Sequence, residues 1–259
     1  MSGRGAERIL EFIEWLARRY EPATLAEITQ AMAVPKSSAL MLLRSLVSAG
    51  YVLRQPDGLY VLIRLPGEPS AGQQGWGTIL RVVEPVLREA VNAARESGFI
   101  AILTEGKVRY LNKLLPLREI RYDRDISHAR TLHEVASGIV LLTGMSQAER
   151  EAYLAGLDEA TAATVRAHVE ATRRDGAFVN LKGVVEGAAG IAAPILSQDG
   201  RVVAALNISG PRERIAQDQE RLKALTIAAA AQASHELAKR SAFFAKNTGR
   251  NDRDQGPSD

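Results

Sequence analysis

The chain has 259 residues, of which 46% are hydrophobic and 24% charged, a composition typical of a globular protein with one large or two moderate domains. The net charge of +3 excludes a polybasic chain, so nucleic-acid binding would require a local basic patch. The absence of cysteine excludes disulfides and thiolate metal sites. No run of about 18 apolar residues occurs, which excludes membrane-spanning helices, and there is no signal-peptide pattern. We therefore expect a cytoplasmic protein.

The first part of the chain predicts three helices followed by a hairpin. An amphipathic helix covers about residues 6–20, with apolar residues at helical spacing on its inner face: Ile9, Phe12, Ile13 and Leu16. The second helix follows Thr24, which is placed to cap it, and is interrupted at Pro35, which lacks an amide donor. The third begins at Lys36 and ends at Gly50, after which two short strands flank the turn sequence Gln-Pro-Asp-Gly. Helix, turn, helix and β-ribbon in this order indicate a winged helix-turn-helix.

The third helix separates an apolar stripe from a polar face. The stripe recurs at helical spacing and would face the core: Ala39, Leu42, Leu43 and Leu46. On the opposite face, Lys36 and the serines beside it suit phosphate contacts. Arg44 suits a guanine or a phosphate, and Leu40 or Met41 suits thymine methyl groups. The candidate DNA-binding residues are Lys36, Ser37, Ser38, Leu40, Met41, Arg44 and, on the hairpin, Arg54. The alternative is a three-helix protein-interaction module with a solvated basic face.

A change in composition follows the hairpin. Residues 65–75 concentrate proline, glycine and polar residues, which is typical of a linker, and we place the domain boundary between Pro66 and Trp76. A helix over about residues 78–96 contains Pro85, which would kink it or start a second segment, and ends at Gly98. Strands over 99–104 and 107–114 form a hairpin, and the charged stretch 118–130 has no assigned structure.

The remaining chain predicts helices and a second hairpin. The helices cover about residues 132–142, 148–154 and 161–174, and the hairpin covers 190–197 and 201–210. Period-two counting places Ala205, Asn207 and Ser209 on one face of its second strand. An alanine-rich helix covers about 214–245, and the polar tail 246–259 is expected to be disordered. The predicted fold class is α+β, with helices against an antiparallel sheet.

Three segments carry a resemblance to a known family. They are GAAGIAAPILSQDGRVVAALNISGP at 187–211, VPKSSALMLLRSLVSAGYV at 34–52 and LHEVASGIVLLTG at 132–144. The chain thereby resembles the isocitrate-lyase-regulator (IclR) type of bacterial transcription factor over residues 8–239. The resemblance implies a winged-helix domain at 1–65, a linker at 66–77 and a GAF-like effector-binding and oligomerisation domain at 78–245. It also implies dimers or tetramers on palindromic operator DNA and a small-molecule effector; no cofactor is expected.

The resemblance also implies an effector site. In such proteins the effector lies between the sheet and the loop before the LHEVASG helix. The corresponding residues here are Ala136, Ser137, Gly138, Gly190, Asn207 and Ser209. Buried polar side chains such as Asn207 and Ser209 need partners, which a ligand or neighbouring backbone can supply.

The sequence departs from the family pattern at three positions. Met41 stands where an arginine is usual, which would give a more apolar DNA contact. Gly183 stands near the place of a common acidic residue, with Glu186 a few positions on. Gly190 stands where cysteine is frequent, which would leave a roomier pocket.

An arginine cluster precedes the pocket helix, formed by Arg118, Arg121, Arg124 and Arg130. At least one could hold a carboxylate through a bidentate pair, and Arg121 is our candidate. The alternative for each is a solvated charge beside the acidic residues of the same stretch. We therefore expect a repressor that is released by a small organic acid, with aromatic acids among the candidates.

Two other classes of function are alternatives. His128, His133 and Glu134, with Asp125 nearby, suggest a metal or acid–base site. However, the histidines are five residues apart, and the sequence has no phosphate loop, nucleophile elbow or paired-carboxylate motif. We expect no metal and no enzymatic activity. The second alternative is a ligand sensor that acts through protein partners without specific DNA binding, for which Met41 is the hint.

Overall fold

The computed structural model describes residues 3–17, 19, 22–55, 57–62 and 76–248. The chain divides into two compact units, one comprising Met1–Arg81 with Arg240–Asp259 and the other comprising Val82–Lys239. Most of the expected linker at 66–77 and of the expected tail at 246–259 lies outside the described residues. None of the helices in the described ranges combines the length and apolar character that crossing a membrane requires.

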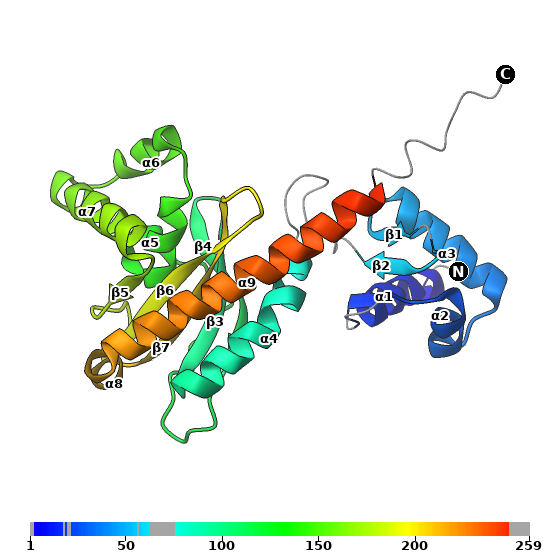
Figure 1. The fold of residues 1–259 in the computed structure, drawn as a ribbon, viewed down its shortest axis with the longest axis horizontal. Coiled ribbons are helices and arrows are strands. Elements are labelled where there is room, and N and C mark those ends of the chain that lie inside the picture. The colour runs from blue at the N-terminus through cyan, green and yellow to red at the C-terminus, as the bar shows by residue number, and fades with distance from the viewer. Residues whose placement is uncertain (1–2, 18, 20–21, 56, 63–75, 249–259) are drawn as a thin grey trace. The chain divides into compact units, whose positions relative to one another are not determined.

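The first unit contains three helices and a two-stranded hairpin (Figure 1). The elements are α1 (Gly3–Ala17), α2 (Leu25–Met32), α3 (Lys36–Ser48), β1 (Val52–Arg54) and β2 (Tyr60–Leu62). The strands pair antiparallel, and Tyr60 of β2 also exchanges two backbone hydrogen bonds with Ala23, of 2.8 and 2.9 Å. The winged helix-turn-helix is therefore confirmed.

The core of this unit follows the predicted stripes with one correction. Phe12, Leu16 and Leu43 are buried in one cluster with Ile28 of α2. Ile9 was expected to face inward but is exposed, because it lies one helical turn before the first residue of that cluster.

The start of α2 is closed by a capping box. The amide of Glu27 donates to the Thr24 hydroxyl over 3.1 Å, and the Thr24 amide donates to the Glu27 carboxylate over 2.7 Å. The helix ends at Ala33, which adopts a left-handed conformation with φ of 49°. Specific local structure thus marks both ends of α2, and the turn before α3 begins at Ala33.

The second unit is built on a five-stranded antiparallel sheet of order β4-β3-β7-β6-β5. The strands are β3 (Ser97–Thr104), β4 (Lys107–Leu114), β5 (Phe178–Asn180), β6 (Ala188–Leu196) and β7 (Val202–Pro211). Both predicted hairpins, β3–β4 and β6–β7, are present, and β3 pairs with β7 so that Phe99 lies opposite Asn207.

Helices cover both faces of this sheet. They are α4 (Trp76–Ala94), α5 (Ala136–Thr143), α6 (Gln147–Leu154), α7 (Glu159–Asp175), α8 (Arg212–Gln217) and α9 (Gln219–Thr248), with the short 3₁₀ helix η1 (Leu132–Glu134) before α5. Phe99 and Ala205 belong to the core that α5 and α7 share with the sheet. Gly98, the neighbour of Phe99, faces α4 instead, and α5–α7 lie together on the side away from α4 (Figure 1). This arrangement confirms the α+β class.

The predicted boundaries need several corrections. The helix expected to end at Gly98 ends at Ala94, and Gly98 lies in β3, where a Cβ atom would be 2.4 Å from Val91 Cγ2. Extended backbone at Val135 splits the helix expected over 132–142 into η1 and α5. A break at Asp218 separates α8 from α9, and the short strand β5 was not predicted.

Candidate functional site

The first candidate site is the outward face of α3. Lys36, Ser37, Met41 and Arg44 are exposed, with Met41 at 65% of its full exposure, while Ser38 and Leu40 are half-buried. Pro35 occupies the N-cap, and no side chain caps the first turn within the part of the chain that the structure describes. Amide donors at the start of this helix are therefore directed toward the surface that carries Lys36.

Arg54 is also exposed, but it lies on β1 rather than α3. Its guanidinium lies 6.0 Å from the centre of the Tyr60 ring, within the range of a weak cation–π contact. All seven predicted DNA-contact residues thus lie in the first unit, six of them on one helix.

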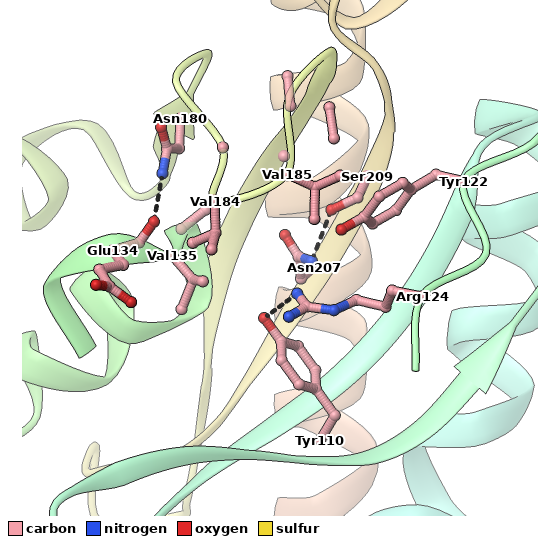
Figure 2. Close-up of a pocket in the computed structure, with 15 residues that line it drawn as sticks. Tyr110, Tyr122, Arg124, Glu134, Val135, Asn180, Val184, Val185, Asn207 and Ser209 are labelled. Atoms are coloured by element: carbon pink, nitrogen blue, oxygen red, sulfur yellow. Dashed lines mark hydrogen bonds between the residues drawn. The ribbon is translucent and has the colours of Figure 1, made fainter. Parts of the chain in front are cut away.

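The second candidate site is a pocket in the second unit, between β7, the start of α5 and the segment that follows β5 (Figure 2). Its volume is about 30 Å³, which admits on the order of two water molecules, since each needs roughly 10–15 Å³ of such space. The labelled residues that line it are Tyr110, Tyr122, Arg124, Glu134, Val135, Asn180, Val184, Val185, Asn207 and Ser209. The lining therefore combines aromatic rings, amides and hydroxyl groups with one guanidinium group, from Arg124, and one carboxylate, from Glu134.

A hydrogen-bonded chain runs from this pocket to α5. Arg124 Nη1 donates to the Tyr110 hydroxyl over 3.1 Å, and that hydroxyl lies 2.9 Å from Ser137 Oγ. The guanidinium also lies over the Tyr110 ring, 4.6 Å from its centre. Burial raises the pKa of the neighbouring Tyr122 hydroxyl.

Gly190 makes room for polar side chains inside the sheet. Asn207 Nδ2 donates to Ser209 Oγ over 2.9 Å, and a Cβ atom on Gly190 would lie only 2.7 Å from Ser209 Oγ. The small residue at 190 was expected to give a roomier pocket. The space is instead occupied by Ser209 and Asn207.

The structure brings together four of the expected effector residues, because Ala136, Gly190, Asn207 and Ser209 all line the pocket. It does not place the other three there. Ser137 lies behind Tyr110, and Gly138 packs against the Leu132 backbone, where a Cβ atom would be 2.0 Å from the carbonyl oxygen.

Arg121, the third of these residues, lies apart from the pocket. Its side chain is exposed and donates to the Arg118 carbonyl oxygen over 3.2 Å, so it points away from the pocket that Arg124 lines. Sequence reasoning also missed Tyr110, Tyr122 and the wall at 183–185. Gly183 within this wall and Gly187 shortly after it were the signal available in the sequence.

His128 and His133 do not come together in a metal or acid–base site. His128 lies 3.6 Å from Asp125, whereas His133 Nδ1 lies 2.8 Å from the Tyr153 hydroxyl. No group of three potential metal ligands occurs among the described residues. His133 and His168 instead line a groove of about 540 Å³, which shares Glu134, Asn180 and Val184 with the pocket.

Comparisons with known proteins agree on one family. The family model described as bacterial transcriptional regulator IclR C-terminal matches residues 77–235, and the IclR helix-turn-helix domain matches residues 5–56. A probable transcriptional regulator of Cupriavidus necator, SauR, is 24% identical over 84% of this chain and 90% of its own. The acetate operon repressor of Salmonella typhimurium is 25% identical over 86% of each chain.

Solved structures agree with the fold. An IclR homologue from Microbacterium hydrocarbonoxydans, solved with 4-hydroxybenzoate, is 22% identical and superimposes with a TM-score of 0.57 over 89% of this chain and 97% of that one. At this identity the likeness concerns the fold.

Proposed function

Because the chain belongs to the IclR family of bacterial transcriptional regulators, it is a DNA-binding regulator and not an enzyme, and we propose that a small organic acid controls its binding to DNA. The acid binds the pocket of the second unit, and its binding releases a repressor from operator DNA. The repressor assignment follows the acetate operon repressor among the relatives.

The observation that carries the DNA-binding role is the outward face of α3. It combines Lys36, two serines and Arg44 around a helix N-terminus whose amides are free to meet phosphate. Arg44 lies about two helical turns after Lys36. The same side of the helix therefore presents one cation to the base edges in a DNA groove and another to the phosphate backbone of the DNA. Met41 adds an apolar contact between them.

The assembly follows from the way such units read DNA. Two copies of the winged helix, at 1–65, contact the half-sites of a palindromic operator as parts of a dimer or tetramer. The linker at 66–77 connects them to the effector-binding and oligomerisation domain at 78–245. A cytoplasmic location is consistent with this role.

The character of the pocket supports an acid as the effector. Arg124 supplies a positive charge, and Tyr110 and Tyr122 supply aromatic surface beside it. The IclR homologue solved with 4-hydroxybenzoate binds a compound that is both aromatic and acidic.

The test is a mobility shift on the protein's own upstream intergenic DNA, with competitor DNA and several salt concentrations. The double variant Lys36→Ala/Arg44→Ala should lose at least tenfold in affinity, and its salt slope should fall by roughly 0.9 for each lost phosphate contact. The exposed cations Lys107 and Arg212, changed together to alanine, serve as the control and should bind DNA as the wild type does.

Two outcomes would contradict the proposal. If the wild type and both variants gave the same weak, salt-sensitive smear on this DNA and on other candidate operators, a sensor acting through protein partners would be favoured. If an acid bound the protein without changing its affinity for DNA, the regulatory link would fail, because coupling between two binding sites is reciprocal.

A further inference from the structure

Arg124 has an unusual set of hydrogen bonds. Its Nη1 atom is satisfied by the Tyr110 hydroxyl, whereas Nε and Nη2 are buried and have no partner among the described residues. These two nitrogen atoms lie on the same edge of the planar guanidinium, and their N–H bonds point in the same direction. That edge is the one that binds a carboxylate through two parallel hydrogen bonds.

The position of Arg124 is fixed before any ligand arrives. Its backbone carbonyl oxygen accepts a hydrogen bond of 3.1 Å from Lys113 Nζ, which also pairs with Asp123 over 2.6 Å. The Tyr110 ring supports the guanidinium from one side at 4.6 Å. A ligand therefore meets a guanidinium that is already oriented, which lowers the ordering cost of binding.

A second polar group faces the same pocket. Asn207 uses one of its two amide atoms in the hydrogen bond to Ser209, and the other is buried without a partner. The Ser209 hydroxyl can donate or accept, so one amide atom of Asn207 is available in either orientation of the amide. A buried polar atom that lacks a partner is costly, and a ligand group can remove this cost.

We propose that Arg124 is the specificity-determining residue of the effector site. It binds the carboxylate of the effector side-on through Nε and Nη2, while Asn207 binds a second hydrogen-bonding group of the same molecule. The effector class is thus a small carboxylic acid that also carries a hydroxyl or similar polar substituent. This inference rests on the proposed function for the identity of the site, and it adds the residue and the chemical class.

The test measures the affinity of the purified full-length protein for acids and for their neutral amides by calorimetry and thermal shift. The probes are acetate, glycolate, benzoate and 4-hydroxybenzoate, each paired with its amide. A hydroxylated acid should bind the wild type, and its amide should bind about 100-fold more weakly, because the amide lacks the charge-assisted pair.

Three variants locate the effect. Arg124→Gln should lower the affinity for the acid about 100-fold, and its melting temperature without ligand should not fall, since a buried guanidinium with unpaired nitrogens is removed. Arg121→Gln, an exposed arginine three residues away, should bind the acid as the wild type does. Asn207→Ala should bind each hydroxylated acid, glycolate or 4-hydroxybenzoate, no more tightly than the corresponding acid without the hydroxyl, acetate or benzoate.

The proposal is overturned if no acid binds the wild type, if acids and amides bind equally, or if Arg124→Gln retains the wild-type affinity. DNA binding of the wild type is measured in parallel without acid. A wild type that binds acid but no DNA would contradict the proposed function alone, whereas acid binding that survives unchanged in Arg124→Gln would contradict this inference alone.

Discussion

Gly138 has a packing role in addition to the effector role expected for it. The resemblance placed it at the effector, yet in the structure it allows η1 to approach the first turn of α5. The Leu132 carbonyl oxygen occupies the space where a Cβ atom would stand, at 2.0 Å. Since that neighbour is backbone, no side-chain rotation can relieve the clash.

We therefore predict that Gly138→Ala destabilises the second unit by about 3 kcal/mol or more, as overpacking against an immobile neighbour does. The free energy of unfolding by urea would measure it. Gly156→Ala is the control, because its Cβ atom would meet the Tyr153 carbonyl oxygen at an ordinary 3.4 Å. Equal stability of the two variants would show that η1 can move away.

The arginine cluster shows where prediction from the sequence stops. Its four arginines lie in a stretch without helix or strand, so no periodicity indicates which side chain points inward. In the structure Arg118 binds Glu96, Arg121 is exposed and Arg124 lines the pocket. The residue type was predictable, and the position was not.

At the scale of elements, the capping box of α2 makes stability depend on pH. Hydrogen bonds from the Thr24 amide and hydroxyl lower the pKa of Glu27 below its ordinary value of 4.5. A carboxyl group with a lowered folded-state pKa stabilises the fold above its unfolded pKa and loses this effect as the pH falls through the folded value.

We predict that the melting temperature of the first unit is higher in the wild type than in Glu27→Gln at pH 7, and that this difference shrinks below about pH 4.5. Melting curves of both proteins between pH 3 and 7 would show it. A difference that stays constant over this range would contradict the role of the charged carboxylate. Glu7→Gln, an exposed carboxylate on α1, serves as the control.

An ion cluster joins three elements of the second unit. Glu96, which is 3% exposed, accepts hydrogen bonds of 2.6 and 2.8 Å from Arg214 at α8, and Arg118 approaches the same carboxylate to 3.3 Å. Arg214 also donates to the Ile120 carbonyl oxygen over 3.2 Å. The cluster therefore anchors the arginine-rich segment that carries Tyr122 and Arg124.

Glu96→Ala should lower the free energy of unfolding by about 3 kcal/mol, because it leaves two arginines without their carboxylate. Urea unfolding would measure this loss, and acid affinity should fall as well, since Arg124 loses its anchored segment. Glu151→Ala removes an exposed pair with Arg166 and should cost less than about 1 kcal/mol. Similar losses in the two variants would argue against a special role for the cluster.

Strong local signals made most elements predictable. Turn and cap residues located α2, α3 and all three hairpins, and alternation correctly placed Asn207 and Ser209 on one face. The three-residue strand β5 is too short to show an alternating pattern in the sequence. The break at Asp218 was not predicted because the helical period of the sequence continues across it.

At the scale of the whole molecule, the pocket depends on long-range pairing. Tyr110 of β4 and Ser209 of β7 reach one pocket because the sheet has the order β4-β3-β7-β6-β5. Local patterns predict the strands but not their order, so the aromatic part of the lining was not predictable without the structure. Adjacent residues can also differ in their contacts: Ala136 lines the pocket, whereas the Ser137 hydroxyl contacts the hydroxyl of Tyr110.

The wall that carries Val184 has a consequence for the time course of ligand binding. Val184 lines both a pocket of about 30 Å³ and a groove of about 540 Å³, and a pocket of that size must enlarge before it holds an aromatic acid, so we predict that the wall moves toward the groove when the acid binds. The observed rate of association should then level off at high acid concentration, at the opening rate of the wall. Stopped-flow tyrosine fluorescence with benzoate would show a plateau, and Val184→Ala should raise it, whereas a rate that rises linearly throughout would mean that the pocket admits its ligand without delay.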